Sequence, residues 1–205
     1  SRKELVAVSD FDICNVYNRL LQAYPNAFVY VWFHPEIGLW LGATPETLLK
    51  VHDNAFNTMA LAGTQVYHEN IAAKWTQKEI DEQLFVTDYI VKKISAFSND
   101  IQVSEVETVR AGSLLHLKTV VNGILNTEEK SKSLFSLIDL LHPTPAVCGL
   151  PKEAAKQFIL ENENYNRSYY TGYLGELNFD NQKENETNLF VNLRCMEIVN
   201  DNAQI

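Results

Sequence analysis

The fold class is decided by residues 27–46, which read AFVYVWFHPEIGLWLGATPE. Two runs rich in aromatic and aliphatic residues, Ala27–Phe33 and Gly38–Gly42, flank the turn His34-Pro35-Glu36. This pattern predicts an antiparallel β-hairpin, because strand-forming runs separated by a short turn pair with each other.

Further strands and a few helices are expected on both sides of this hairpin. Strand-like runs occupy residues 5–8, 47–51, 55–60, 101–109, 114–125, 170–179 and 188–199, and helical periodicity occupies 11–24, 76–97, 132–141 and 152–161. The apolar residues of 76–97 fall on two faces, which predicts packing on two sides. Because strands and helices do not alternate regularly, we predict an α+β fold with antiparallel sheets flanked by helices. With no visible repeat or linker, residues 1–205 are predicted to form a single domain.

Composition narrows the function classes. The 205 residues are 46% hydrophobic and 21% charged, which is typical of globular proteins and not of disordered chains. A formal charge of −9 argues against a nucleic acid or an anionic membrane as partner. No apolar run approaches the length of a membrane span. Cys14, Cys148 and Cys195 lack disulfide or zinc spacing, so we expect a cytoplasmic protein. We also expect the protein to be a monomer.

Three short motifs have both a chemical and a structural interpretation. Gly42-Ala43-Thr44-Pro45-Glu46 places a carboxyl group at a strand end, but it also fits an ordinary helix start. Leu61-Ala62-Gly63-Thr64 could bring backbone amides close to an anion, but it also fits an ordinary turn. Glu79 and Glu82 share one side of the predicted helix 76–97 and could bind Mg²⁺, or they could be solvated charges.

A fourth motif, His142–Pro151, reads HPTPAVCGLP between two predicted helices. Three prolines in ten residues restrict the backbone more than a simple connection requires. Rigid loops of this kind often hold a ligand through main-chain N–H groups. The motif therefore favours a binding loop over a plain connector.

Together the motifs resemble those of the chorismate-utilising enzymes, and among them the isochorismate synthases. The matching segments, in family order, are GATPE at 42–46, LAGT at 61–64, KEIDE at 78–82 with Val86, HLKT at 116–119, LHPTPAVCGLP at 141–151, YTGYLG at 170–175 and VNLRC at 191–195. The HPTPAV form of the loop resembles the water-using isochorismate synthases more than the ammonia-using anthranilate and aminodeoxychorismate synthases.

The resemblance implies a Mg²⁺-dependent isomerase that converts chorismate to isochorismate in menaquinone or siderophore biosynthesis. It implies that Glu46 is the general acid, that Glu82 binds Mg²⁺ and that Arg194 holds a substrate carboxylate. Further substrate contacts are implied for Gly63, Thr64, His116, Thr144, Ala146 and Val147. His116 fits a core histidine equally well. Salicylate synthase, another chorismate-utilising enzyme and a non-catalytic family scaffold stay open as alternatives.

The sequence also departs from the family pattern. Ser1-Arg2 resemble the last residues of the strand that carries the general-base lysine, which would then precede residue 1. A second metal-binding Glu and a substrate-binding Lys are expected beyond the strand of Arg194. A chain of residues 1–205 alone is therefore expected to be inactive or nearly so. Glu176 stands where many relatives have an aromatic residue.

Overall fold

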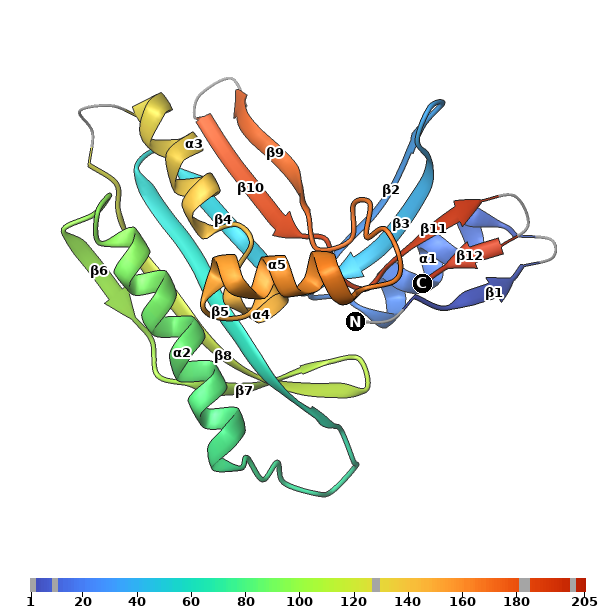
Figure 1. The fold of residues 1–205 in the computed structure, drawn as a ribbon, viewed down its shortest axis with the longest axis horizontal. Coiled ribbons are helices and arrows are strands. Elements are labelled where there is room, and N and C mark those ends of the chain that lie inside the picture. The colour runs from blue at the N-terminus through green and yellow to red at the C-terminus, as the bar shows by residue number, and fades with distance from the viewer. Residues whose placement is uncertain (1–2, 9–10, 127–129, 181–184, 200–201) are drawn as a thin grey trace.

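Two antiparallel sheets and the helices around them make up the computed structural model (Figure 1). It describes residues 3–8, 11–126, 130–180, 185–199 and 202–205. Ser1 and Arg2, matched above to a lysine-bearing strand, and the tip of the last predicted hairpin at 181–184 lie outside these residues. The α+β class with antiparallel sheets is confirmed, whereas the single domain stays a prediction.

The first sheet contains the predicted hairpin. Its strand order is β1-β12-β11-β3-β2, with β1 at Leu5–Ala7, β2 at Phe28–His34, β3 at Gly38–Thr44, β11 at Cys195–Val199 and β12 at Asn202–Gln204. The hairpin pairs residues from Phe28 with Thr44 to His34 with Gly38. The helix α1, Ile13–Ala23, lies against β2 and β3, and the side chain of Asp12 caps its first turn by accepting from the backbone of Asn15.

The second sheet is larger and carries most of the core. Its order is β6-β8-β5-β4-β10-β9 with β7 paired to β8; the bounds are β4 Thr47–His52, β5 Ala55–Val66, β6 Asp100–Val103, β7 Glu107–Ala111, β8 Leu114–Ile124, β9 Tyr173–Asp180 and β10 Asn185–Val191. The sequence predicts one strand over 101–109, but the structure divides it into β6 and β7, which pair with different parts of the long strand β8.

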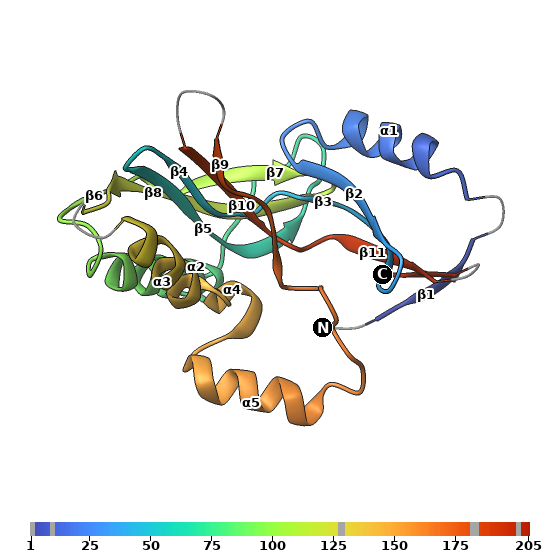
Figure 2. The same ribbon diagram turned by 90° about the horizontal axis from the view of Figure 1, so that it is seen from above.

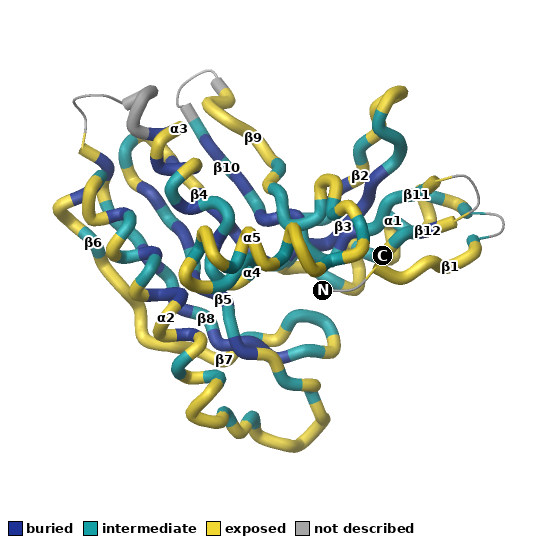
Figure 3. The backbone as a smooth tube through the Cα atoms, viewed as in Figure 1, coloured by how far each residue is buried: buried dark blue, intermediate teal, exposed yellow. Residues whose placement is uncertain are grey.

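Two helices cover one face of the second sheet. These are α2, Gln77–Ile94, and α3, Lys130–Leu141, and their buried sides face the buried stretches of β4, β5 and β10 (Figure 3). As predicted for 76–97, α2 packs on more than one side, because Val86 and Ile90 are buried in the core and Tyr89 contacts α3. Not all of its apolar residues are buried, however. Leu84 and Phe85 are 47% and 62% exposed. The short α4, Pro145–Cys148, and α5, Lys152–Asn162, follow, and α5 stands apart from both sheets (Figure 2).

Two crossovers between the sheets run side by side. Residues 188–199 are predicted as one strand, but β10 ends at Val191 in the second sheet and β11 begins at Cys195 in the first. The break coincides with a left-handed backbone at Arg194, whose φ is 50°. The other crossover, between β3 and β4, contains Glu46. Backbone hydrogen bonds join the two, from Val191 N to Glu46 O at 3.0 Å and from Ala43 N to Arg194 O at 3.2 Å.

Within the part of the chain that the structure describes, no helix combines the length and apolar character needed to cross a bilayer. Cys14, Cys148 and Cys195 are all free thiols, as their spacing predicts.

Candidate functional site

A cavity of about 930 Å³ opens where the paired crossovers meet α2, α4 and the β7–β8 hairpin. Eight of the nine residues predicted for the site line it, namely Glu46, Gly63, Thr64, Glu82, His116, Ala146, Val147 and Arg194. The ninth, Thr144, contacts Glu46 from behind the cavity wall. Segments that are distant in sequence therefore meet at one cavity.

The carboxyl group of Glu46 is almost fully enclosed, with 3% of the residue exposed. The Thr144 hydroxyl donates to its Oε1 at 3.5 Å. Thr44 fixes the backbone beneath it, because its hydroxyl donates to the carbonyl of Val191 at 2.6 Å and accepts from the Glu46 N–H at 3.4 Å. Burial raises the pKa of Glu46 to about 7, while the Thr144 hydrogen bond acts in the opposite direction. Glu46 is thus poised to donate or accept a proton near neutral pH.

His116 and Arg194 form a second group on the cavity wall. Nδ1 of His116 lies 3.0 Å from the carbonyl oxygen of Gly63, which can only accept, so Nδ1 carries the proton. Nε2 is then the acceptor for Nη2 of Arg194 at 2.6 Å. Burial, and then the Arg194 charge, lower the pKa of His116 against the effect of the Gly63 hydrogen bond, so the ring is neutral. Nη1 of Arg194 also donates to the carbonyl of Ala111 at 3.1 Å.

The LAGT motif forms an irregularity within the pairing of β5 with β8. The register shifts between Ala62 and Gln65, and Gly63 has a φ of 67°, a backbone that favours glycine. This turn aims the Gly63 carbonyl at His116, and the Thr64 hydroxyl lies 3.2 Å from the same ring nitrogen. The motif thus fixes the tautomer of His116.

The proline-rich loop is anchored at its first residue, His142. At its start, the carbonyl of His142 accepts from Nζ of Lys152 at 2.7 Å, and Nε2 of His142 donates to the carbonyl of Thr171 at 2.8 Å. Pro145 then begins α4 directly after Thr144. The loop therefore holds Thr144 against Glu46 and presents Ala146 and Val147 to the cavity.

The two carboxylates of α2 have different surroundings. Glu79 accepts from the backbone and hydroxyl of Thr76 at 2.7 and 2.9 Å, a capping box, and these bonds lower its pKa. Glu82 faces the cavity with its side chain 47% exposed, and its Oε1 lies 3.6 Å from Nζ of Lys78. Among the described residues, no three His, Cys, Asp or Glu side chains gather as a metal site. Glu82 fits one Mg²⁺ position, with water and a substrate anion supplying the others.

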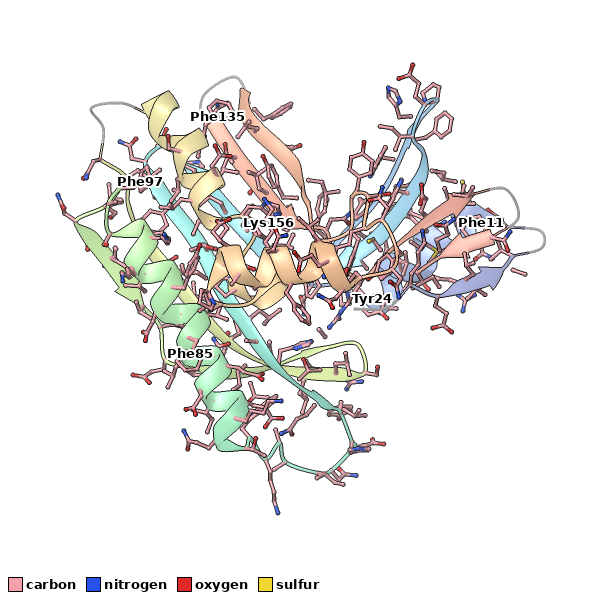
Figure 4. All side chains as sticks on the ribbon, viewed as in Figure 1. Phe11, Tyr24, Phe85, Phe97, Phe135 and Lys156 are labelled. Atoms are coloured by element: carbon pink, nitrogen blue, oxygen red, sulfur yellow. The ribbon has the colours of Figure 1, made fainter. Side chains whose placement is uncertain are left out.

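The sequence interpretation missed several residues that line the cavity, including Lys78, Phe85, Arg167 and Tyr170. Phe85 is labelled on α2 in Figure 4. Arg167 forms a two-pronged ion pair with Glu163, at 2.6 and 2.5 Å, and Nη1 donates to the Thr171 hydroxyl at 3.3 Å. Because Glu163 and Arg167 follow the end of α5 at Asn162, helical spacing in the sequence could not have indicated this pair.

Comparisons with known proteins agree with this arrangement. The family model described as "Chorismate binding enzyme" matches residues 1–205. The vibriobactin-specific isochorismate synthase of Vibrio cholerae serotype O1 is 32% identical over 167 residues, which are 77% of this chain and 41% of that protein. The chain spans about two fifths of the length of the first curated relatives it matches.

Solved structures share the fold. MenF, the menaquinone-specific isochorismate synthase from Escherichia coli, superimposes with a TM-score of 0.80 at 24% identity, over 99% of this chain and 49% of that one. Anthranilate synthase component I from Streptococcus pneumoniae TIGR4 gives 0.76 at 26% identity, over 99% and 45%. The antiparallel architecture is therefore shared by an isochorismate synthase and an anthranilate synthase component.

Proposed function

Because this chain belongs to the chorismate binding enzyme family, we propose that its cavity binds chorismate and converts it to isochorismate. One observation carries the proposal: Glu46, buried and with a pKa of about 7, shares the cavity with Arg194. The similarity to isochorismate synthases and the HPTPAV form of the loop favour water as the attacking group. The three free thiols are compatible with a cytoplasmic enzyme.

Arg194 is proposed to hold a carboxylate of chorismate. A guanidinium binds a carboxylate through two parallel hydrogen bonds, which fixes orientation as well as position. Its contacts with His116 and the Ala111 carbonyl hold it within the cavity wall. The backbone of Ala146 and Val147 borders the same space and contributes further substrate contacts in this proposal.

Glu46 is proposed to be the general acid. Water attacks C2 of chorismate, the ring double bonds shift, the C4–oxygen bond breaks, and the Glu46 carboxyl group gives its proton to the departing hydroxyl. A pKa of about 7 keeps a large share of Glu46 protonated at neutral pH, as an acid requires. These residues account for binding and for protonation of the leaving group, and the base that activates water is not assigned among them.

Glu82 is proposed to bind Mg²⁺ at the cavity edge. When bound, the ion supplies positive charge that holds a substrate carboxylate and offsets negative charge in the site. Nζ of Lys78 lies 3.6 Å from Oε1 of Glu82, and both side chains are exposed, so the ammonium group can move aside for the ion. Glu79 is committed to the capping box and is not proposed as a ligand.

The experiment incubates the protein, as its gene encodes it, with chorismate and Mg²⁺ and separates the products by chromatography. Isochorismate as the product supports the proposal. Salicylate with pyruvate would instead indicate a salicylate synthase, and an aminated product formed with ammonia would indicate the other branch. Chorismate bound but unchanged would identify a non-catalytic scaffold.

A further inference from the structure

Asn192 is the best-connected residue of the crossover between β10 and β11, and 3% of it is exposed. Its backbone carbonyl accepts from the N–H of Thr171 at 2.9 Å. Its side-chain Nδ2 donates to the carbonyl of Tyr169 at 2.8 Å, and its Oδ1 accepts from the hydroxyl of Tyr30. The crossover is therefore tied to two other parts of the chain, β2 and the segment before β9.

The orientation of the Asn192 amide follows from its partners. The carbonyl of Tyr169 can only accept, so the amide nitrogen must face it and the amide oxygen must face Tyr30. Burial raises the pKa of Tyr30 far above its ordinary value, so its hydroxyl stays protonated and donates at every relevant pH. Tyr30 thus holds Asn192 in one orientation.

The ring of Tyr30 is enclosed by the first sheet. The ring lies across Gly42, where an added Cβ would come within 2.8 Å of the ring, so glycine leaves the room that the ring occupies. The ring is 6% exposed and packs in the same cluster as Trp40 and Cys195. The first sheet therefore fixes the hydroxyl that reaches the crossover.

Arg194 follows two residues later with its left-handed backbone. Such a backbone is unfavourable for a residue with a side chain, and it persists only where neighbouring contacts hold it. On the C-terminal side, Cys195 is fixed by its pairing with Gly42. On the N-terminal side, the anchor is Asn192. We propose that Asn192, held by Tyr30, is a positioning residue that sets the backbone of Arg194 and so the direction of its guanidinium; its effect on substrate rests on the proposed function.

The test uses Tyr30→Phe, which removes one hydroxyl and leaves Oδ1 of Asn192 without its donor. Tyr89→Phe is the matched control, because it deletes the same atom from a partly buried tyrosine whose hydroxyl donates to the carbonyl of Leu140 at 3.2 Å, in the α2–α3 layer. Both variants are made in the protein as its gene encodes it.

The first measurement needs no substrate. The N–H of Ala43 donates to the carbonyl of Arg194, so its hydrogen-exchange rate reports the Arg194 backbone. We expect Tyr30→Phe to speed exchange at Ala43 by about tenfold, since a buried acceptor is left unpaired. Tyr89→Phe should leave this amide at the wild-type rate. Unchanged exchange at Ala43 in Tyr30→Phe would overturn the positioning role.

The second measurement is a double-mutant cycle on chorismate binding. We expect Tyr30→Phe to raise the KM for chorismate by about tenfold while kcat changes by less than about twofold. In a protein that already carries Arg194→Ala, Tyr30→Phe should have no further effect on the Kd for chorismate. An equal loss with and without Arg194 would show that Tyr30 acts elsewhere and would overturn the inference. Failure of the wild-type protein to bind chorismate would overturn the proposed function instead, and the exchange rates would still decide the positioning role.

Discussion

Nη2 of Arg194 donates to Nε2 of His116 across 2.6 Å, although the two residues are 78 positions apart in the sequence. The bond requires a neutral imidazole, and the carbonyl of Gly63 ensures it by taking the Nδ1 proton. His116 therefore orients a cation in the cavity and is not free to act as a proton donor through Nε2.

Replacing His116 by Gln should weaken substrate binding more than turnover. The variant removes the ring that holds both Gly63 and Arg194, so the guanidinium loses its orientation. We expect KM for chorismate to rise by about tenfold, with kcat reduced much less, as measured by steady-state kinetics. The control is His52→Gln at the exposed end of β4. Equal effects of the two substitutions would show that His116 has no part in binding.

Arg194→Lys should bind the substrate carboxylate much more weakly than the wild-type protein does. Lysine keeps the charge but lacks the planar fork that makes two parallel hydrogen bonds. We expect the Kd for chorismate, measured by titration calorimetry, to rise by about 10- to 100-fold. Arg110→Lys provides the comparison, because Arg110 is exposed and stacks on Tyr67. Wild-type affinity in Arg194→Lys would remove Arg194 from the binding site.

Thr144→Val should move the pH profile of the reaction upward. The Thr144 hydroxyl stabilises the ionised form of Glu46 and so lowers its pKa, against the larger effect of burial. Without the hydroxyl the pKa rises further, and the alkaline limb of kcat/KM should shift to higher pH. Thr58→Val, which deletes a buried hydroxyl bonded to the carbonyl of Leu48, should leave the limb in place. A shift to lower pH would contradict this account of Glu46.

The buried Glu46 should make the protein less stable as pH rises. Its pKa is raised from 4.5 to about 7 in the folded state, so the folded chain binds the extra proton between these values. The contribution of protonated Glu46 to the free energy of unfolding is complete below pH 4.5 and is lost as pH rises through 7. The loss amounts to about 3 kcal/mol. Glu46→Gln should therefore match the wild-type Tm near pH 4.5 and exceed it at pH 8. Parallel Tm curves for the two proteins would contradict the raised pKa.

Glu82→Gln should raise the Mg²⁺ concentration needed for half-maximal activity. The amide is a weaker ligand than the carboxylate for a hard divalent cation. We expect a shift of about tenfold or more, measured by titrating Mg²⁺ at saturating chorismate. Asp81→Asn is the control on the same turn of α2, where Asp81 accepts from Gln77 at 2.9 Å. The same Mg²⁺ dependence in wild type and Glu82→Gln would exclude Glu82 as a ligand.

Local patterns were sufficient to predict most of the elements but not every boundary, and they did not indicate α4 or β12. The hairpin of β2 and β3 follows from two strand-forming runs around His34-Pro35-Glu36, and the structure pairs them as expected. The division at Arg194 has no such signal, because the apolar run continues through it and an arginine rarely adopts a positive φ. The buried face of α2 could not be predicted either. Leu84 and Phe85 are apolar, yet they lie off the face that meets the sheet.

The motifs were sufficient to predict which residues belong to the site, but not the contacts that these residues make with one another. The motifs indicate the cavity residues, and the structure brings eight of them to one cavity. The role of His116 was open, because it depends on Gly63 and Arg194, 53 and 78 positions away. The raised pKa of Glu46 likewise comes from its burial, which is a feature of the tertiary structure. The single domain, the monomer and the individual roles of the site residues stay predictions.

The most direct test of the account is the rate of isochorismate formation in Glu46→Gln. The amide keeps the size of the side chain but cannot protonate the leaving hydroxyl. We expect kcat to fall by about 10²- to 10⁴-fold with chorismate still bound, while Glu36→Gln in the exposed turn between β2 and β3 keeps the wild-type rate. Near-wild-type turnover in Glu46→Gln would contradict the central claim that this buried carboxyl group is the acid.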